Sequence, residues 1–365
     1  MNKRISIAVV MVVAIFCCAG LVGAQPLAQP NTQPSQAATS DYPLLTPPED
    51  DGPVVVQVSF EIQDIDEINE ENETFEFTGV LTLKWHDNRQ VFDPTVVGAK
   101  EKIYQGDYQF NELSPSWFPQ IVLVNSSGPF EQQGVVLRAL PDGTQILISK
   151  ISAVAKTELN LRRFPFDRQR LQAVFEVLGF DHSEVVLQVE EETTVNALWV
   201  PQWTITGTGM SAQDRAASYA GRRGIASMFV VSVDVRRVSF YIGRLVILPL
   251  IVIVLLTFSV FWMDRASLGD RISVSFIGIL TAVAYQVVMN DIMPRIGYVT
   301  WIDGFLNLSF LLMVGTVIIN LVVGRLDQHK RHDVAHRVDV LCRWIFPITY
   351  LGLILISFAV MFLRF

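Results

Sequence analysis

Residues 269–294 read GDRISVSFIGILTAVAYQVVMNDIMP, a stretch apolar and long enough to cross a membrane as a helix. Asp270 and Arg271 stand at its start, Ser273 follows, and Asp291 stands near its end. Charged groups are costly in hydrocarbon, and buried hydroxyls need hydrogen-bond partners. A membrane helix with this pattern therefore needs a surface that is turned away from lipid.

The rest of the chain also indicates a membrane protein. Of its 365 residues 50% are hydrophobic, and the mean hydropathy of +0.36 is too high for an ordinary soluble protein. Buried helices of a soluble core are the alternative, but four long apolar blocks in the last third of the chain argue against it. Each block is close to the ~20 residues that a spanning helix requires. The blocks are residues 241–263, 272–289, 305–323 and 344–363.

The basic residues between these blocks predict the orientation. The link between the second and third blocks has Arg295 as its clear cation, whereas the first link holds Arg265 and Arg271. Cytoplasmic loops carry an excess of Lys and Arg, so the first and third links are predicted to be cytoplasmic. This predicts a multi-pass protein of the cell (inner) membrane, with the region before residue 239 and the C-terminus on the extracellular or periplasmic side. The third link contains Arg325, Lys330, Arg331, Arg337 and Arg343.

The start of the chain predicts export. Residues 1–24 have a basic start, an apolar core and small residues at the end, which is typical of a secretory signal peptide cut after Ala24. An uncleaved anchor helix is the alternative. Residues 25–52 are rich in Pro, Gln and Ser and predict a disordered lead-in. The mature chain would keep one cysteine, Cys342, and therefore no internal disulfide.

Residues 53–238 alternate between apolar and polar side chains. Segments such as VVVQVSFEIQDI (residues 54–65) have the period-two pattern of strands, and turn residues such as PDG at 141–143 separate them. Many short strands without a helical period favour a β-sandwich. The predicted fold class is β plus membrane α: an extracellular antiparallel β-sandwich over residues 53–238, followed by a four-helix transmembrane bundle over residues 239–365.

The second apolar block carries one mixed stripe when it is placed on a helix of 3.6 residues per turn. A ring of such helices around a water-filled path would keep the acids hydrated, rings of Asp favour cations, and an aliphatic constriction can close a pore by dewetting. A single amphiphilic packing helix is the alternative, and periodicity alone does not decide between the two. The stripe consists of Asp270, Ser273, Ile277, Leu280, Ala284, Val287 and Asp291.

Three motifs in the β-rich part point to a family. They are ELNLRRFPFDRQRLQAVFEV (residues 158–177), LTLKWHDNRQVFD (81–93) and WFPQIVLVN (117–125). Together with the four helices that follow, they resemble the pentameric ligand-gated ion channels of the Cys-loop receptor superfamily, in prokaryotic form. Residues 283–303, VAYQVVMNDIMPRIGYVTWID, are similar to the amine-gated bacterial channels of the Erwinia type. The resemblance extends from about Val54 to the C-terminus.

The loop around FPFD fits the bacterial branch of this superfamily. Animal receptors place a cysteine on each side of the loop. Thr157 and Leu171 stand at the corresponding positions here, so the resemblance implies that no bridge forms. The short link between the third and fourth helices is also similar to the bacterial members.

The resemblance implies a homopentamer whose second transmembrane helix, about residues 270–291, lines the pore. Asp270 then matches the selectivity acid at the cytoplasmic mouth, and Leu280 matches the mid-pore gate. The family also couples its two domains through a charged cluster, with the link after the second helix receiving the motion. The matching residues are Glu70 or Glu71, Phe164, Pro165, Phe166, Asp167, Arg237 and Pro294.

The resemblance places the ligand between neighbouring β-domains, under a hairpin at residues 209–226. Aromatic rings can hold a cation over their faces. The arginines of the hairpin would instead suit an anionic or neutral ligand, unless they face water. A titrating histidine is a further possibility, so the predicted activator is a small-molecule agonist or protons. The candidate ligand-binding residues are Phe180, Asp181, His182 and Tyr219.

Other function classes have little support. The sequence has none of the HExxH, GxSxG, Walker or CxxC motifs, so it predicts neither an enzyme nor a cofactor. The acids at 64–73 and 190–192 lack a Ca²⁺-loop spacing, the three histidines at 329–336 are a common linker decoration, and no metal site is predicted. No basic run suggests a nucleic-acid partner. The predicted partners are membrane lipid, identical subunits, the agonist and permeating monovalent cations, and the rival function is a non-conducting membrane-anchored β-sandwich sensor or binding protein.

Overall fold

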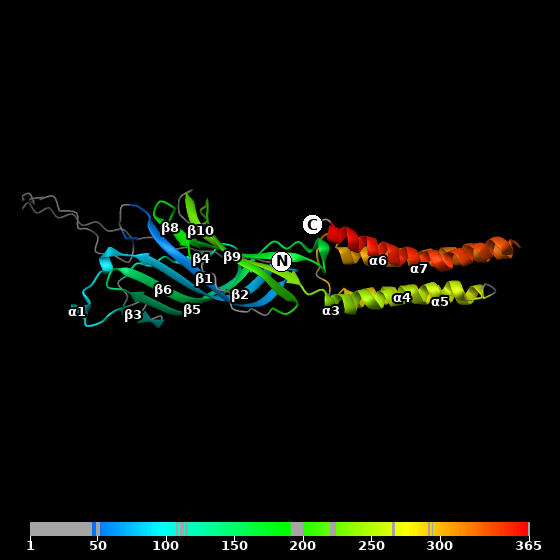
Figure 1. The fold of residues 1–365 in the computed structure, drawn as a ribbon, viewed down its shortest axis with the longest axis horizontal. Coiled ribbons are helices and arrows are strands. Elements are labelled where there is room, and N and C mark those ends of the chain that lie inside the picture. Colours follow the sequence, from blue (N-terminus) through cyan, green and yellow to red (C-terminus); the bar gives the residue numbers. More distant parts are fainter. Residues whose placement is uncertain are drawn as a thin grey trace, which may run out of the picture. The chain divides into compact units, whose positions relative to one another are not determined.

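The computed structural model describes residues 46–48, 52–106, 109, 113, 116–190, 200–219, 224–264, 267–290, 293 and 295–363. The predicted signal peptide and nearly all of the predicted lead-in lie outside these residues. In the described part, ten strands precede the long helices (Figure 1). The strands are β1 (Val54–Asn69), β2 (Thr74–His86), β3 (Lys102–Gln105), β4 (Ile121–Leu123), β5 (Ser126–Ala139), β6 (Thr144–Lys156), β7 (Arg168–Val177), β8 (Val185–Val189), β9 (Trp203–Ala216) and β10 (Ile225–Arg237).

The strands form two sheets, and the predicted β-sandwich is confirmed. One sheet has the order β3-β5-β6-β2-β1-β8 and the other the order β4-β7-β10-β9. Their pairs are antiparallel except that β8 runs parallel to β1, with Val54 opposite Val185. The sandwich is antiparallel as predicted apart from this one edge pair. The chain enters β8 from β7 of the other sheet, and a strand that arrives by such a crossover can lie in either direction, which the period-two pattern does not encode.

Aromatic side chains join the two sheets. The ring of Phe175 in β7 lies 5.5 Å from that of Phe60 in β1 and 6.3 Å from that of Phe77 in β2, and it stacks on Phe229 in β10 at 4.7 Å. All four side chains are buried. Burial of each such ring stabilises the fold by about 1.5–3 kcal/mol. This core fixes the two sheets against each other and thereby the loops at both ends of the sandwich.

The predicted turn at residues 141–143 joins β5 to β6. Gly143 adopts a φ of +89°, which favours glycine. The side chain of Asp142 accepts a hydrogen bond from the backbone N–H of Thr144 at 3.0 Å, and this bond lowers the pKa of the Asp142 carboxyl. The turn residues therefore act as the sequence indicates.

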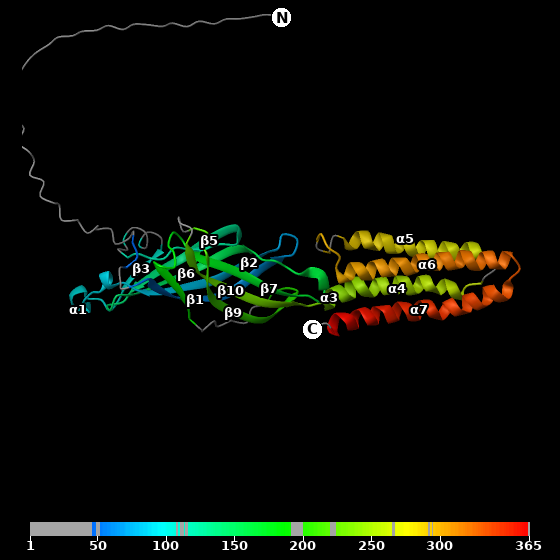
Figure 2. The same ribbon diagram turned by 90° about the horizontal axis from the view of Figure 1, so that it is seen from above.

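Four helices in the described part are long and apolar enough to cross a membrane. The first runs over Phe240–Trp262 in four segments, and Figure 2 shows the other three beside it. Its segments are α3 (Phe240–Ile242), the wider π-type turn η4 (Gly243–Ile247), α4 (Leu248–Phe258) and the 3₁₀ turn η5 (Ser259–Trp262). The others are α5 (Leu268–Met289), α6 (Trp301–Gln328) and α7 (His332–Leu363).

A neighbouring helix compensates for the proline in the first helix. Pro249 has no N–H, so the carbonyl of Leu245 one turn earlier loses its helical donor. The hydroxyl of Tyr285 in α5 donates to this carbonyl and, at 3.3 Å, to that of Val246. The first helix and α5 are thus hydrogen-bonded where the first helix changes its winding.

Close packing also joins α4 to α5. A Cβ atom on Gly278 of α5 would lie 2.1 Å from the hydroxyl oxygen of Thr257 in α4, a distance that real Cβ atoms do not reach. Glycine therefore permits the close approach of the two helices.

The helices α6 and α7 extend beyond the predicted apolar blocks. Thr300 and Asp303 form a capping box at the start of α6, four residues before the predicted block. The charged residues of the predicted third link lie mostly in the ends of α6 and α7, which leaves residues 329–331 between the helices. Apolarity marks the part of a helix that is suited to lipid, whereas polar residues can continue the helix outside it. The predicted class, a β-sandwich followed by four membrane-type helices, is confirmed.

Candidate functional site

The predicted pore stripe of α5 faces away from the chain's own bundle. Leu280 is 69% exposed, whereas Arg271 and Ser275 on another face are buried. Asp291 lies outside the described residues. All six described members of the stripe are exposed: Asp270, Ser273, Ile277, Leu280, Ala284 and Val287.

The exposed surface of α5 is wider than the stripe. Further side chains on both flanks of the stripe lack cover from the same chain. The surface of α5 therefore leaves room for other helices on both flanks, as well as for a water-filled path along the stripe. The flanking exposed residues are Phe276, Thr281, Val283, Gln286 and Val288.

The first turn of α5 separates two opposite charges. The side chain of Asp270 is exposed, whereas that of Arg271 is 1% exposed. Arg271 Nη2 lies 2.5 Å from Asp339 Oδ1 in α7, and its Nε donates to the carbonyl of Val260 at 3.1 Å. The sequence predicts that Asp270 lies on the stripe and that Arg271 is rotated away from it. In the structure the side chain of Arg271 has a specific partner away from the stripe, Asp339.

Three of the predicted coupling residues meet at the end of the sandwich where β10 leads into the first helix. Arg237, at the end of β10, places Nε 2.8 Å from Asp167 Oδ1 and Nη1 2.8 Å from Glu70 Oε1. The side chains of Arg237 and Asp167 are 2% and 1% exposed, and that of Glu70 is 25% exposed. The rings of Trp203 and Phe164 flank the guanidinium at 4.0 and 4.9 Å. Of the two predicted acids Glu70 makes the contact, because the turn after β1 leaves Glu71 exposed to solvent.

The loop before β7 orients Asp167. Gln169 donates from Nε2 to Asp167 Oδ2 at 2.6 Å and to the carbonyl of Asn160 at 3.0 Å. Its own side-chain oxygen accepts from the backbone N–H of Asn160 at 2.9 Å. The glutamine of the motif thus holds the loop closed and fixes the carboxylate that pairs with Arg237.

The same loop contacts the membrane-type helices. Phe166 packs edge-on against Trp301 of α6 and Phe358 of α7, with ring centroids 5.4 and 5.2 Å apart. The carbonyl of Pro165 accepts from the hydroxyl of Ser239 at 2.6 Å, just before the first helix. The loop therefore touches the starts of two helices and the end of a third.

Tyr298 is a junction contact that sequence reasoning missed. Its hydroxyl accepts from the backbone N–H of Leu161 at 2.9 Å and donates to the carbonyl of Leu159 at 3.3 Å. The predicted receiving residue on this link, Pro294, lies outside the described residues. A tyrosine in the similar segment 283–303 was the available signal, but spacing alone gave it no partner.

Three of the candidate ligand residues, Phe180, Asp181 and His182, lie on the loop between β7 and β8, and Tyr219 lies on the β9–β10 hairpin. Phe180 packs edge-on against Trp117 at 5.8 Å. His182 Nδ1 lies 3.0 Å from Asp214 Oδ1 of β9, and the His182 backbone N–H donates to the carbonyl of Ile225 in β10. Asp181 lies beside the same hairpin, with its Cβ close to the backbone of residue 224. His182 is thus hydrogen-bonded to both strands of the hairpin.

Glu176 is a buried acid that sequence reasoning did not single out. It lies near the end of β7 and is completely buried. Its carboxylate accepts from the backbone N–H groups of Ser218 at 3.0 Å and Tyr219 at 3.1 Å. Tyr219 itself is 48% exposed. The carboxylate therefore anchors the hairpin near its tip, and the signal was a lone acid in the apolar end of β7, residues 173–177.

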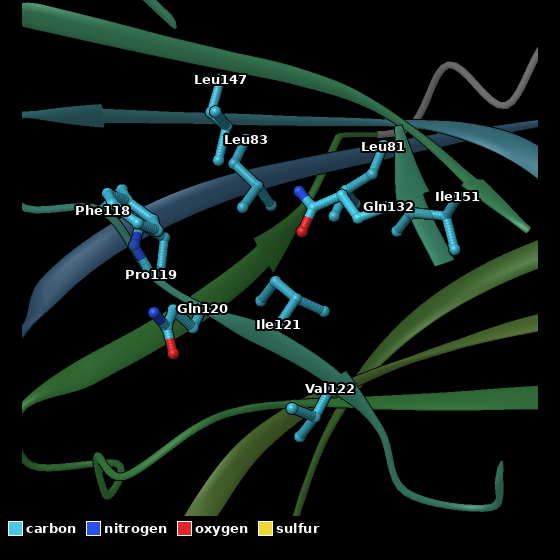
Figure 3. A pocket seen from close by; sticks show the side chains of 10 residues that line it. All are labelled: Leu81, Leu83, Phe118, Pro119, Gln120, Ile121, Val122, Gln132, Leu147 and Ile151. Carbon is cyan, nitrogen blue, oxygen red and sulfur yellow. The ribbon is translucent and has the colours of Figure 1, made fainter. Parts of the chain in front are cut away.

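A cavity of about 230 Å³ lies between the sheets (Figure 3). Its walls are aliphatic and aromatic apart from the amides of Gln120 and Gln132. The sequence gave no indication of it, because its lining comes from distant strands. The lining residues are Leu81, Leu83, Phe118, Pro119, Gln120, Ile121, Val122, Gln132, Leu147 and Ile151.

The histidines near the α6–α7 link are engaged separately. His332 Nδ1 lies 2.6 Å from Asp327 Oδ1, and His329 Nδ1 lies 2.8 Å from the carbonyl of Arg325. Within the described residues, no three His, Cys, Asp or Glu side chains come close enough together to hold a metal ion.

Comparison with known proteins gives two matching families. Residues 33–237 match the neurotransmitter-gated ion-channel ligand binding domain, and residues 246–333 match the neurotransmitter-gated ion-channel transmembrane region.

Individual relatives carry different names. A proton-gated ion channel of Gloeobacter violaceus is 25% identical over 307 residues, which cover 84% of this chain and 82% of the relative. The γ-aminobutyric acid receptor subunit rho-3 of Homo sapiens is 26% identical over 279 residues, which cover 73% of this chain and 57% of that subunit. The subunit theta of Mus musculus is 26% identical over 291 residues, which cover 77% of this chain and 44% of the relative. The chain thus spans about half the length of these receptor subunits.

Proposed function

Since the chain belongs to the family of neurotransmitter-gated ion channels, we propose that it forms a homopentameric, cation-selective channel. Five copies of α5 surround the pore, and residues 270–291 line it. The β-sandwich over residues 53–238 and the C-terminus face the outside of the inner membrane, and residues 239–365 form the channel. The predicted signal peptide (residues 1–24) and the predicted lead-in (residues 25–52) precede them.

The separation of charge in the first turn of α5 carries this proposal. An exposed acid beside a buried, paired arginine leaves net negative charge on the surface of the helix. Five such surfaces around a narrow mouth would concentrate cations and repel anions, because low-dielectric walls focus the field. The exposure of the aliphatic stripe supports the same role for α5, with Leu280 at the level of the gate.

The charged cluster of Glu70, Asp167 and Arg237 is the proposed coupling element. It joins β1, the loop before β7 and the end of β10, and the chain continues from Arg237 into the first helix. Removal of Asp167 or Arg237, the buried partners of this cluster, is costly, so the cluster favours discrete arrangements over gradual deformation. Phe166 and Tyr298 then transmit a change in the loop to α6, α7 and the link after α5.

The activator is a small molecule or protons. The names of two relatives refer to protons and to γ-aminobutyric acid, so the family membership does not select one. The site that we propose lies under the β9–β10 hairpin between neighbouring sandwiches, with Phe180, Asp181, His182 and Tyr219 near it. The likeness to amine-gated bacterial channels of the Erwinia type stays a prediction.

The test is an electrical screen of purified protein in planar bilayers. Primary amines, amino acids and a series of acidic pH steps are applied while single-channel currents are recorded. We expect discrete openings with at least one of these activators. A correctly assembled pentamer that stays silent under the whole screen would favour the rival function, a non-conducting membrane-anchored sensor or binding protein.

A further inference from the structure

The proposed selectivity depends on the separation of two adjacent charges. Asp270 and Arg271 are sequence neighbours in the first turn of α5. If both side chains faced the pore, the ring of carboxylates and the ring of guanidiniums would lie at one level and their fields would largely cancel. Selectivity for cations therefore requires a group that keeps Arg271 out of the water.

Asp339 is that group in this structure. It lies in α7, 68 residues after Arg271 in the sequence, and its side chain is 4% exposed. Its Oδ1 is 2.5 Å from Arg271 Nη2. Nε of the same guanidinium donates to the carbonyl of Val260 at 3.1 Å, near the end of the first helix. This carbonyl also accepts from the backbone N–H of Met263 at 3.2 Å, and carbonyls at a helix end carry partial negative charge, so they suit a cation.

A second arginine donates hydrogen bonds to the neighbouring carbonyl, that of Phe261. Arg343 of α7 donates from Nε and Nη2 to the carbonyl of Phe261 at 3.2 and 3.0 Å, and it lies over the ring of Trp262 at 5.5 Å. The end of the first helix thus receives two guanidiniums. Without the charge of Asp339, carbonyl dipoles alone would oppose the positive charges of the buried Arg271 and the partly buried Arg343.

We propose that Asp339 is the positioning residue that sets the charge selectivity of the channel, by holding the guanidinium of Arg271 inside the bundle. The proposal rests on the proposed function. Arginine cannot lose its charge in a protein, so a guanidinium that loses its carboxylate must move to water. Its long side chain can reach the nearest water, which at the first turn of α5 is the mouth beside Asp270.

The variant Asp339→Asn tests this role, with the chloride-to-sodium permeability ratio from reversal potentials as the readout. We expect the ratio to rise at least about tenfold, the lower end of the ion-concentrating effect of charged clefts. Asp333→Asn is the matched control, because it removes the same charge from an exposed position in the first turn of the same helix. Its ratio should equal that of the wild type.

The double variant Arg271→Gln with Asp339→Asn separates positioning from direct electrostatics. If Asp339 acts by holding Arg271, removal of both charges leaves Asp270 unopposed and restores cation selectivity. If Asp339 acted through its own charge, the double variant would be as poorly selective as Asp339→Asn. A merely structural role would not produce loss and recovery of selectivity.

The outcomes distinguish this proposal from the proposed function. An anion-selective wild type would overturn the function itself, whereas a cation-selective wild type with an unchanged Asp339→Asn ratio would overturn only the role of Asp339. If Asp339→Asn does not assemble, the swapped variant Arg271→Asp with Asp339→Arg keeps a buried ion pair. We expect the swapped variant to assemble and conduct cations, and an anion-selective swapped channel would contradict the proposal.

Discussion

Arg237 and Arg271 are both buried, and both bind carboxylates, but their surroundings differ. Arg237 lies where three segments of the β-sandwich meet the first helix, and one of its partners, Glu70, is 25% exposed. Arg271 lies among helices, between Asp339 and the carbonyl of Val260. The first cluster can exchange a partner for water, whereas the second has no such partner among its described contacts.

This difference teaches how one chemical group can serve two purposes. A buried ion pair adds little net stability, because desolvation offsets the attraction, but it strongly disfavours states in which one partner is missing. Next to water, as at the partly exposed Glu70, that property suits a switch. Inside a packed bundle, the same property fixes one side chain. We therefore assign gating to Arg237 and permanent positioning to Arg271.

The largest effect is expected for Arg237→Ala. The substitution leaves Asp167 buried without its cation, which costs about 3–5 kcal/mol in comparable sites. We expect agonist-evoked currents to fall more than a hundredfold, a factor that corresponds to about 2.8 kcal/mol, while agonist binding to the assembled pentamer changes little. Arg236→Ala is the control, since Arg236 immediately precedes Arg237 in β10 and its side chain is exposed. A normal response from well-expressed Arg237→Ala would remove the distinction between the two clusters.

Leu280→Ser tests whether α5, the helix that begins beside Arg271, contains the gate. A ring of hydroxyls is wetted more easily than a ring of leucines, so the closed pore should leak and the agonist concentration for half-maximal opening should fall about tenfold. Val283→Ser changes a side chain off the stripe and should behave like the wild type. Unchanged leak and unchanged sensitivity in Leu280→Ser would argue against a gate at this level.

Tyr285→Phe tests how strongly a single buried polar contact fixes the helices of the bundle, the region that contains Arg271. The loss of the hydroxyl leaves the Leu245 carbonyl, already deprived of a donor by Pro249, without its partner from α5. A buried carbonyl without a donor costs about 1–3 kcal/mol, so thermal unfolding of the pentamer should shift to lower temperature. Tyr241→Phe, at an exposed tyrosine of the same helix as Leu245, should leave the unfolding temperature unchanged. Equal shifts in both variants would mean that the hydrogen bond is unimportant.

The smallest effect is expected for Glu70→Gln. Glu70 is partly exposed and Asp167 keeps its pair with Arg237, so the loss should be below about 1 kcal/mol and the shift in agonist sensitivity below about fivefold. Glu71→Gln removes the same charge one position later, from an exposed side chain. Dose–response curves of the two variants measure the difference. A larger shift for Glu71→Gln would mean that the observed contact is not the one used in gating.

Much of the fold was predictable because it depends on local patterns. Period-two alternation marks strands such as β1, and apolar blocks mark the four helices. The direction of β8 was not predictable, because it depends on a crossover between sheets. The helix ends at Trp301 and His332 were also missed, because polar residues continue helices beyond the apolar part.

The site could be predicted where spacing or motif carries the information. The phase of α5 separates Asp270 from Arg271, and the FPFD motif identifies Asp167. Two adjacent acids in one turn left Glu70 and Glu71 equivalent until the turn geometry was known. The partner of Arg271 is 68 residues distant, and no local pattern connects the two.

The central claim is that the exposed acid and the buried arginine of α5 together select cations. The most direct test is the reversal potential of wild-type and Asp270→Ala channels in a sodium chloride gradient across a planar bilayer. The account predicts a wild-type reversal close to the sodium equilibrium potential and a shift towards zero in Asp270→Ala, as the field of the ring is lost. A wild-type reversal at the chloride equilibrium potential would contradict the account.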